Sequence, residues 1–179
     1  MNHPAPKDGR HPARDLYESV VLQARRPEFY LNCGVSDSVD GRFDMIALHA
    51  FLVLRRLKRD HERTADLAQN LFDTMFEDME NNLREMGAGD LGVSRRVKAM
   101  AKAFYGRIAA YEAGLASGDE VLAEALLRNL YRQREPEDPG AMCRYMRSEA
   151  EALDAMDVER LLEGEVAFGP PPGSGADQI

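Results

Sequence analysis

Hydrophobic positions recur every three or four residues along most of the chain, which is the period of an amphipathic α-helix. The pattern is most regular over residues 93–116, where apolar residues follow at spacings of four, three, four, four, three and four. Similar patterns predict helices over about 15–25, 43–59, 62–86, 120–133 and 139–156, with a further short turn over 157–163. No useful run alternates apolar and polar residues as a half-buried strand does. We therefore predict an all-α fold, a single-domain bundle of six or seven helices.

Proline and glycine mark the expected boundaries of this bundle. Pro27 is predicted to end the first helix and to open a loop that contains Phe29 and Tyr30. The segment 1–13 is expected to be flexible, and residues 14–163 are expected to form the helical domain. From residue 164 onward the chain is rich in Pro and Gly, which predicts a disordered tail over 164–179.

Composition is that of a soluble globular protein. Apolar residues make up 44% of the 179 residues and charged residues 30%. Cys33 and Cys143 are too few and too far apart for a disulfide framework, which favours a reducing compartment. The most apolar run, Met45–Leu54, is ten residues long, whereas a bilayer span needs about 20. No secretory signal or mitochondrial presequence pattern is visible in the first thirteen residues. We expect a cytoplasmic protein, and peripheral contact with the inner membrane stays open.

Charge is distributed unevenly along the chain. The formal net charge of −8 argues against a nucleic-acid partner. Residues 91–115 nevertheless carry five basic residues and one acidic residue, a net of +4, between two acidic segments. One interpretation is that neighbouring helices have complementary solvated faces. The other is a basic surface that meets an acidic partner or an anionic lipid surface. The basic residues of that surface would be Arg55, Arg56, Lys58, Arg59, Arg95, Arg96, Lys98 and Lys102.

Catalytic and metal-binding patterns do not emerge. A di-iron bundle needs Glu three residues before His, but His49 is preceded there by Ile46 and His61 by Lys58. His49 lies in an apolar run and is interpreted as a hydrogen-bonded core residue. The run from Gly87 to Gly92 matches a nucleotide-binding glycine pattern in letters only, because it follows a helix instead of a strand. We therefore predict no enzyme, no cofactor and no metal.

A stripe of Met and Phe on the predicted 62–86 helix is the strongest binding feature. Flexible Met side chains are common on surfaces that accept varied apolar partners. The stripe fits an ordinary core face, or a groove for an apolar client. As a groove it would consist of Phe72, Met75, Phe76, Met79 and Met86. A basic rim beside it would consist of Arg55, Arg56, Arg95, Arg96 and Lys102.

Several mixed strings, in order along residues 16–115, resemble one known family. They include Gln23-Ala-Arg-Arg-Pro-Glu-Phe-Tyr30, Leu48-His-Ala-Phe-Leu-Val-Leu-Arg-Arg56, Leu71-Phe-Asp-Thr-Met-Phe-Glu-Asp-Met79 and Asn82-Leu-Arg-Glu-Met-Gly87. Further strings are Asp40-Gly-Arg-Phe-Asp-Met-Ile46 and Gly89-Asp-Leu-Gly-Val93 followed by Ala103-Phe-Tyr-Gly-Arg107. The chain thus resembles the ubiquinol–cytochrome c chaperone family, the assembly factors of the cytochrome bc1 complex.

This resemblance implies a chaperone that binds newly made cytochrome b and supports assembly of the respiratory-chain complex. Mitochondrial members of the family work with a small partner protein near the ribosomal tunnel exit, so the ribosome and such a protein are further possible partners. The lack of a presequence pattern indicates a bacterial member. Two alternatives stay open: a helical lipid- or quinone-binding protein and, more weakly, an all-α transcription regulator.

Overall fold

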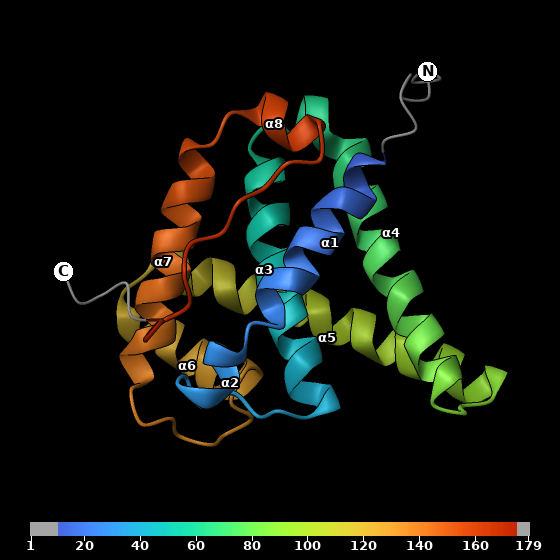
Figure 1. The fold of residues 1–179 in the computed structure, drawn as a ribbon, viewed down its shortest axis with the longest axis horizontal. Helices are drawn as coiled ribbons and strands as arrows, with labels where there is room; N and C mark the ends of the chain where they lie inside the picture. The colour runs from blue at the N-terminus through green and yellow to red at the C-terminus, as the bar shows by residue number, and fades with distance from the viewer. Residues whose placement is uncertain (1–10, 175–179) are drawn as a thin grey trace.

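Residues 11–174 are described by the computed structural model, and this part of the chain contains helices and loops but no strand (Figure 1). The helices are α1 (Pro12–Ala24), α2 (Pro27–Leu31), α3 (Val39–Lys58), α4 (His61–Glu85), α5 (Asp90–Ala116), α6 (Asp119–Asn129), α7 (Pro139–Ala155) and α8 (Val158–Leu162). Six of them have eleven residues or more, whereas α2 and α8 are single turns of five. The predicted all-α class and the six long helices are confirmed.

Helix α3 is the central element, as its apolar sequence predicts. It packs against α1, α4 and α7, while α5 crosses behind it and continues into α6 (Figure 1). Ser38 caps its first turn, because the Ser38 hydroxyl accepts the amide hydrogen of Gly41 at 3.1 Å. A Cβ at position 41 would lie 1.9 Å from the carbonyl oxygen of Ser36, so only glycine fits there. The cap and this close approach fix where the central helix begins.

The junction of α5 and α6 depends on a second close approach. A Cβ at Gly114 would lie 2.8 Å from the Cα of Leu122. The absence of a side chain at position 114 therefore lets the two helices pack backbone to side chain. Together with Tyr111 and Phe104, which are fully buried, this contact holds α5 on the core.

The structure corrects the predicted loop after Pro27. Residues 27–31 form α2, and Pro27 is its first helical residue. Proline can both end one helix and begin the next, because its missing amide hydrogen is not needed in a first turn. The short helix places Phe29 in the core, where its ring contacts His49 and Tyr145 edge to face at centroid distances of 5.5 and 5.2 Å.

The ends of the chain also differ from the prediction. Helix α1 begins at Pro12, within the segment expected to be flexible; residues 1–10 lie outside the described part. Residues 164–174, predicted as the start of a disordered tail, instead form an extended segment that we call the strap. It runs from α8 back along α7, as the red trace in Figure 1 shows. Residues 175–179 of the predicted tail lie outside the described range.

Specific contacts order the strap despite its Pro and Gly content. The amide of Gly169 donates to both carboxylate oxygens of Glu149 at 3.0 Å. The carbonyl of Gly169 accepts from Gln23 at 2.8 Å, and the ring of Phe168 packs on His49 at 5.2 Å. Both backbone polar groups of Gly169 are therefore bonded to side chains, one from α1 and one from α7, which compensates for the absence of backbone pairing.

Candidate functional site

The Met and Phe stripe of α4 contributes mainly to the core. Met75, Phe76 and Met79 are buried, and Phe72 is half-buried. The ring of Phe72 lies 4.6 Å from that of Phe76. Only Met86, 55% exposed, reaches fully into solvent. The five residues predicted as a client groove therefore do not form one open surface in this structure.

The predicted basic rim divides into two separate groups. Arg55 and Arg56 lie near the end of α3, beside α7, whereas Arg95, Arg96 and Lys102 lie on the first half of α5. Figure 1 places these two regions at opposite ends of the molecule, because α3 ends near α8 and α5 begins at the far corner. A single rim of five cations is therefore not formed.

Arg55 and Arg56 bind the end of α7. The guanidinium of Arg55 donates to both carboxylate oxygens of Asp154, at 3.0 and 3.2 Å. Arg56 is buried, and it donates to the carbonyl oxygens of Leu153 and Met156, each at 2.8 Å. These carbonyls lie at the C-terminal end of α7 and at its C-cap, where the regular donors four residues further on are missing. Both arginines thus fasten α7 to α3 and are engaged within the protein.

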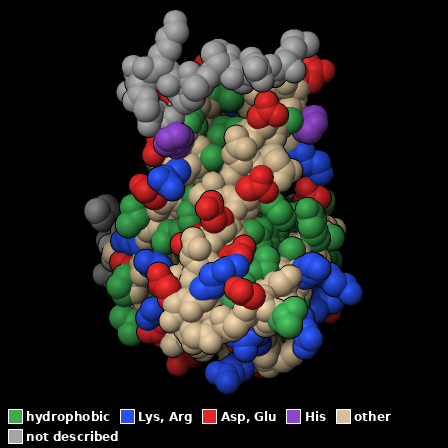
Figure 2. Space-filling view, turned by 90° about the vertical axis from the view of Figure 1, so that its right-hand side faces the viewer, with side chains coloured by type: hydrophobic (Ala, Val, Ile, Leu, Met, Phe, Trp, Pro, Cys, Tyr) green, Lys and Arg blue, Asp and Glu red, His purple; other side chains and the backbone are tan. Residues whose placement is uncertain are grey.

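Of the remaining cations, Arg95 and Lys102 lie on one exposed side of α5, whereas the exposed Arg96 lies about 100° farther around the helix. We define the α5 face as five exposed residues at spacings of four, three, four and three: Leu91, Arg95, Lys98, Lys102 and Tyr105. Residues at these spacings share one side of a helix. Leu91 is 88% exposed and Tyr105 61%, so the row of cations has an apolar residue at each end. Figure 2 shows hydrophobic side chains beside a group of Lys and Arg side chains on this side of the molecule.

Sequence reasoning found the cations of the α5 face but missed its two apolar residues. Leu91 lies four residues before Arg95, and Tyr105 lies three residues after Lys102, so both fall on the same side of the helix. This spacing could have predicted them from the sequence. The half-buried ring of Phe72 packs against Tyr105: the two ring centroids are 5.7 Å apart, and the centroid of Phe72 lies 5.9 Å from that of Phe104. The α5 face therefore continues into the exposed edge of the α4 stripe.

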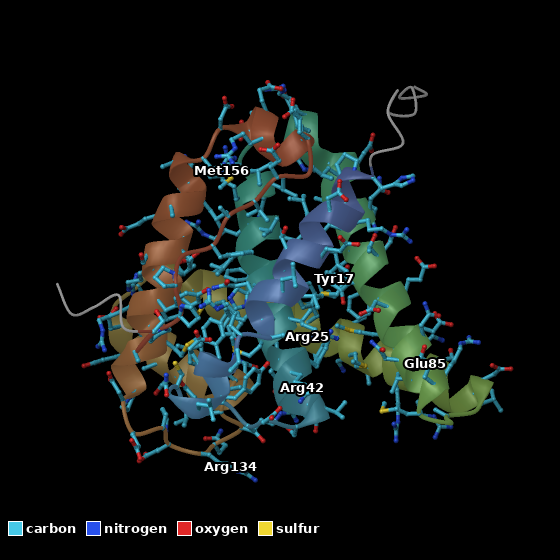
Figure 3. All side chains as sticks on the ribbon, viewed as in Figure 1. Tyr17, Arg25, Arg42, Glu85, Arg134 and Met156 are labelled. Carbon is cyan, nitrogen blue, oxygen red and sulfur yellow. The ribbon has the colours of Figure 1, made fainter. Side chains whose placement is uncertain are left out.

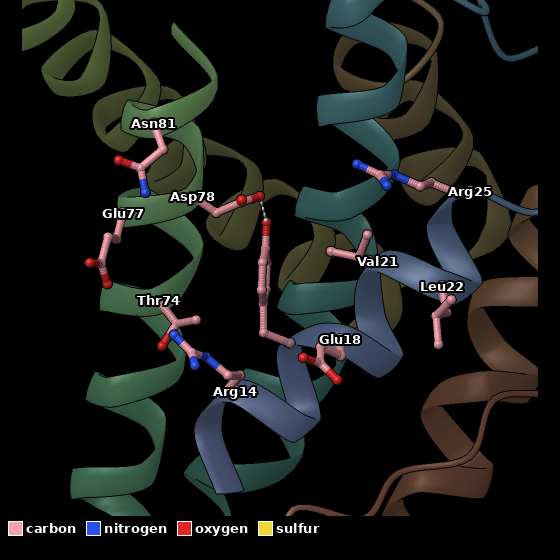
Figure 4. A pocket seen from close by; sticks show the side chains of 10 residues that line it. Arg14, Glu18, Val21, Leu22, Arg25, Thr74, Glu77, Asp78 and Asn81 are labelled. Atoms are coloured by element: carbon pink, nitrogen blue, oxygen red, sulfur yellow. Dashed lines mark hydrogen bonds between the residues drawn. The ribbon is translucent and has the colours of Figure 1, made fainter. Parts of the chain in front are cut away.

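An open groove separates α1 from α4. Its volume is about 470 Å³, and charged or polar side chains from both helices line it, with Val21 and Leu22 at one end (Figure 4). Tyr17 of α1 and Asp78 of α4 both line the groove, and the hydroxyl of Tyr17 donates to Asp78 at 2.7 Å. Burial raises the pKa of Tyr17 well above its usual range, as does the hydrogen bond with Asp78. The phenol therefore stays protonated and acts as a brace between the two helices.

Two buried polar clusters could suggest chemistry. In the first, the ring of His49 bonds to the carbonyl of Met45 at 2.9 Å and to the hydroxyl of Tyr145 at 2.8 Å. These partners assign the proton to Nδ1, because a carbonyl oxygen can only accept. Burial lowers the pKa of His49 to about 4. His49 is a neutral core residue, as its apolar surroundings in the sequence predict.

The second buried cluster was not predicted. Asp44 is fully buried and accepts from Arg107 at 2.6 Å and from Arg132 at 2.7 Å. Burial raises the pKa of Asp44, and the hydrogen bond from Arg132 and the charges of both guanidinium groups oppose that rise. Arg132 has a φ of +50°, in the left-handed region, just after α6 ends. The cluster ties α3, α5 and the end of α6 together, and nothing about it requires a ligand.

Residues 11–174 show no feature typical of a metal site or of a membrane span. No group of three His, Cys, Asp or Glu side chains lies close enough to hold a metal ion within that range. Across the same residues, no helix combines the length and the apolar character that crossing a bilayer requires. Burial raises the pKa of Cys33 to about 11, so this thiol remains protonated.

Comparison with known proteins gives a consistent result. A family model described as ubiquinol-cytochrome C chaperone matches residues 31–168. The chain is similar to ubiquinol-cytochrome-c reductase complex assembly factor 1 of Xenopus laevis, with 29% identity over 87% of this chain and 79% of that protein. It is 31% identical to the human factor over 87% of this chain, and it spans 53% of that longer protein. A crystal structure of the Cbp3 homolog from Brucella abortus matches with a TM-score of 0.81 and 35% identity, over 89% of each chain.

Proposed function

The chain belongs to the ubiquinol–cytochrome c chaperone family, and on that premise we propose that it is a non-enzymatic assembly chaperone that binds newly made cytochrome b. The observation that carries the proposal is the family match over residues 31–168, which spans every helix from α3 to α8. The proposal is also supported by the relatives in frog and human, which are named as assembly factors of the ubiquinol–cytochrome c reductase complex. Cytochrome b, as an apolar membrane subunit, fits a helper that offers apolar side chains to an unassembled client.

We assign client contact to the edge of α4 that lies beside α5. Of the predicted groove residues, Phe72 in the middle of α4 is half-buried and Met86 at its end is exposed, whereas Met75, Phe76 and Met79 are buried in the core. Flexible and aromatic side chains can adapt to an apolar segment without a preformed pocket. Assembly factors need not retain their client, so a small adaptable contact suits release once the complex forms.

The test is deletion of the gene in the organism that encodes it, followed by haem spectra and immunoblots of its membranes. We expect cytochrome b and ubiquinol–cytochrome c reductase activity to fall while other respiratory complexes persist. Normal cytochrome b in the deletion strain would overturn the proposal. The lipid- or quinone-binding alternative would then be tested by organic extraction of the purified protein and mass spectrometry.

Complementation locates the contact. We expect Met86→Ser to restore less cytochrome b than wild type, because it removes an exposed apolar side chain without opening the core. Leu31→Ser, at another exposed apolar position, is the matched control and should restore normal levels. Co-purification from the same strains would show whether a ribosome or a small partner protein accompanies the chaperone.

A further inference from the structure

We propose that the α5 face docks this protein on an anionic phospholipid membrane. This inference does not depend on the proposed client, because it concerns a surface that can be tested with lipid alone. It rests on the row of cations and apolar ends described above, on the charge around that row, and on its shape.

The α5 face is long and continuous. Fourteen residues separate Leu91 from Tyr105, which corresponds to about 21 Å along a helix at 1.5 Å per residue. Arg95, Lys98 and Lys102 lie between them on the same side, and all five side chains are exposed. The opposite side of the helix packs inward through Val93, Phe104 and Tyr111. The helix is therefore anchored to the bundle and presents one fixed side outward.

Charge on this face is uncompensated. Between Asp90 and Glu112, α5 carries no acidic residue. Among residues 11–174, no salt bridge involves Arg95, Lys98 or Lys102, although many other arginines of the chain are paired. Acidic residues do occur at the corner, where Asp90 pairs with Arg84. A protein of net charge −8 is repelled by an anionic surface as a whole, so a basic face must supply the attraction and fix the orientation.

Shape favours a flat partner over a peptide. Two grooves lie between α1 and α4, one of them reaching Leu162 of α8, and neither is lined by a residue of α5. The α5 face is instead the exposed side of a helix that begins at a corner of the molecule and crosses behind α3 (Figure 1). An exposed row of Lys and Arg can reach headgroups while Leu91 and Tyr105 enter the interface, as in amphipathic helices that lie on membranes. An acidic peptide would need walls that this surface lacks.

The experiment measures binding of the purified full chain to vesicles by flotation. One set contains equal parts of phosphatidylglycerol and phosphatidylcholine, and the other contains phosphatidylcholine alone. We expect binding to the anionic vesicles, weakened by added salt, and little binding to the neutral ones. Near an anionic surface each cation contributes roughly a fivefold gain in affinity. Removing three should therefore weaken binding on the order of a hundredfold.

Matched variants separate the α5 face from total charge. The test variant is Arg95→Gln/Lys98→Gln/Lys102→Gln. The control makes the same change in net charge at three exposed arginines elsewhere: Arg25→Gln/Arg128→Gln/Arg134→Gln. Figure 3 shows that Arg25 and Arg134 lie well away from Glu85, which marks the end of α4. Leu91→Ser should also weaken binding, whereas the exposed control Leu31→Ser should not. All of these side chains are exposed, so circular dichroism should show folded proteins.

The outcomes are distinct. Loss of vesicle binding in the test variant alone supports the α5 face as a lipid-docking surface. Equal binding of the test and control variants, or no preference for anionic vesicles, overturns it. If wild type binds no vesicle but the test variant fails to restore cytochrome b in the deletion strain, the face meets an acidic protein partner instead. If vesicles bind as expected while the deletion leaves cytochrome b normal, the proposed function fails and the docking surface stands.

Discussion

Lowering the pH from 7 to 5 is expected to destabilise this protein through His49. The ring is fully buried between Met45 and Tyr145, and burial lowers its pKa to about 4. In the unfolded chain the same ring titrates near about 6.5. Between these two pKa values the unfolded state binds a proton on His49 and the folded state does not. The contribution of His49 to stability is therefore fully present above about pH 6.5 and is lost as the pH falls toward about 4. Linkage gives a loss of about 2 kcal/mol between pH 7 and pH 5.

Urea unfolding at both pH values measures this loss, with His49→Gln as the comparison. The carboxylates of the two proteins are the same, including buried Glu149, whose raised pKa acts in the opposite sense. The difference between the two pH losses therefore isolates the imidazole. We expect wild type to lose about 2 kcal/mol more than the variant. If the variant does not fold, NMR titration of the wild-type ring serves instead. A folded-state His49 that titrates near about 6.5 would refute the reasoning.

Three further perturbations test the packing. Gly114→Ala should cost about 1–3 kcal/mol in urea unfolding, because its Cβ would meet the α6 backbone at 2.8 Å. The control Gly106→Ala, which faces open space on the same helix, should be neutral or stabilising. Asp44→Ala should cost about 3–5 kcal/mol, since it leaves the buried Arg107 unpaired; an effect below about 1 kcal/mol would mean that the cluster is solvated. Removing residues 164–179 should lower Tm, because buried Glu149 loses the amide of Gly169 and Gln23 keeps only its bond to Tyr145; an unchanged Tm would show the strap to be dispensable.

The helical architecture follows from local patterns that are strong in this sequence. The 93–116 periodicity predicted α5 within three residues at its start, and the apolar run around Met45 predicted the central helix. His49 was interpreted correctly because an apolar neighbourhood constrains a histidine whatever the tertiary partners are. The Met and Phe stripe was ambiguous for a physical reason: a core face and a client groove have the same periodicity, and only the position of α5 over Phe76 distinguishes them.

What could not be predicted depends on contacts between distant residues. Asp44 meets Arg107 and Arg132 across 63 and 88 residues, and no local pattern marks such a cluster. The prediction for residues 164–174 was wrong because a Pro- and Gly-rich composition favours disorder and does not reveal tertiary contacts. Here the hydrogen bonds of Gly169 with Gln23 and Glu149, which we call the clamp, hold the strap in place. The five cations of the predicted basic rim were grouped by charge alone. The sequence does not show that Arg55 pairs with Asp154 of α7.

The clamp on Gly169 has a consequence for how the protein is made. Gln23 emerges from the ribosome 146 residues before the peptide unit that it binds, and Glu149 emerges 20 residues before it. Domains generally begin to fold during synthesis, starting from the N-terminus. Here α1, α3 and α7 can assemble early, but the polar groups between them find their last partner only after residue 169 has left the tunnel. The contacts of Gly169 therefore form later than those among α1, α3 and α7, and until then Gln23 and Glu149 lack this partner.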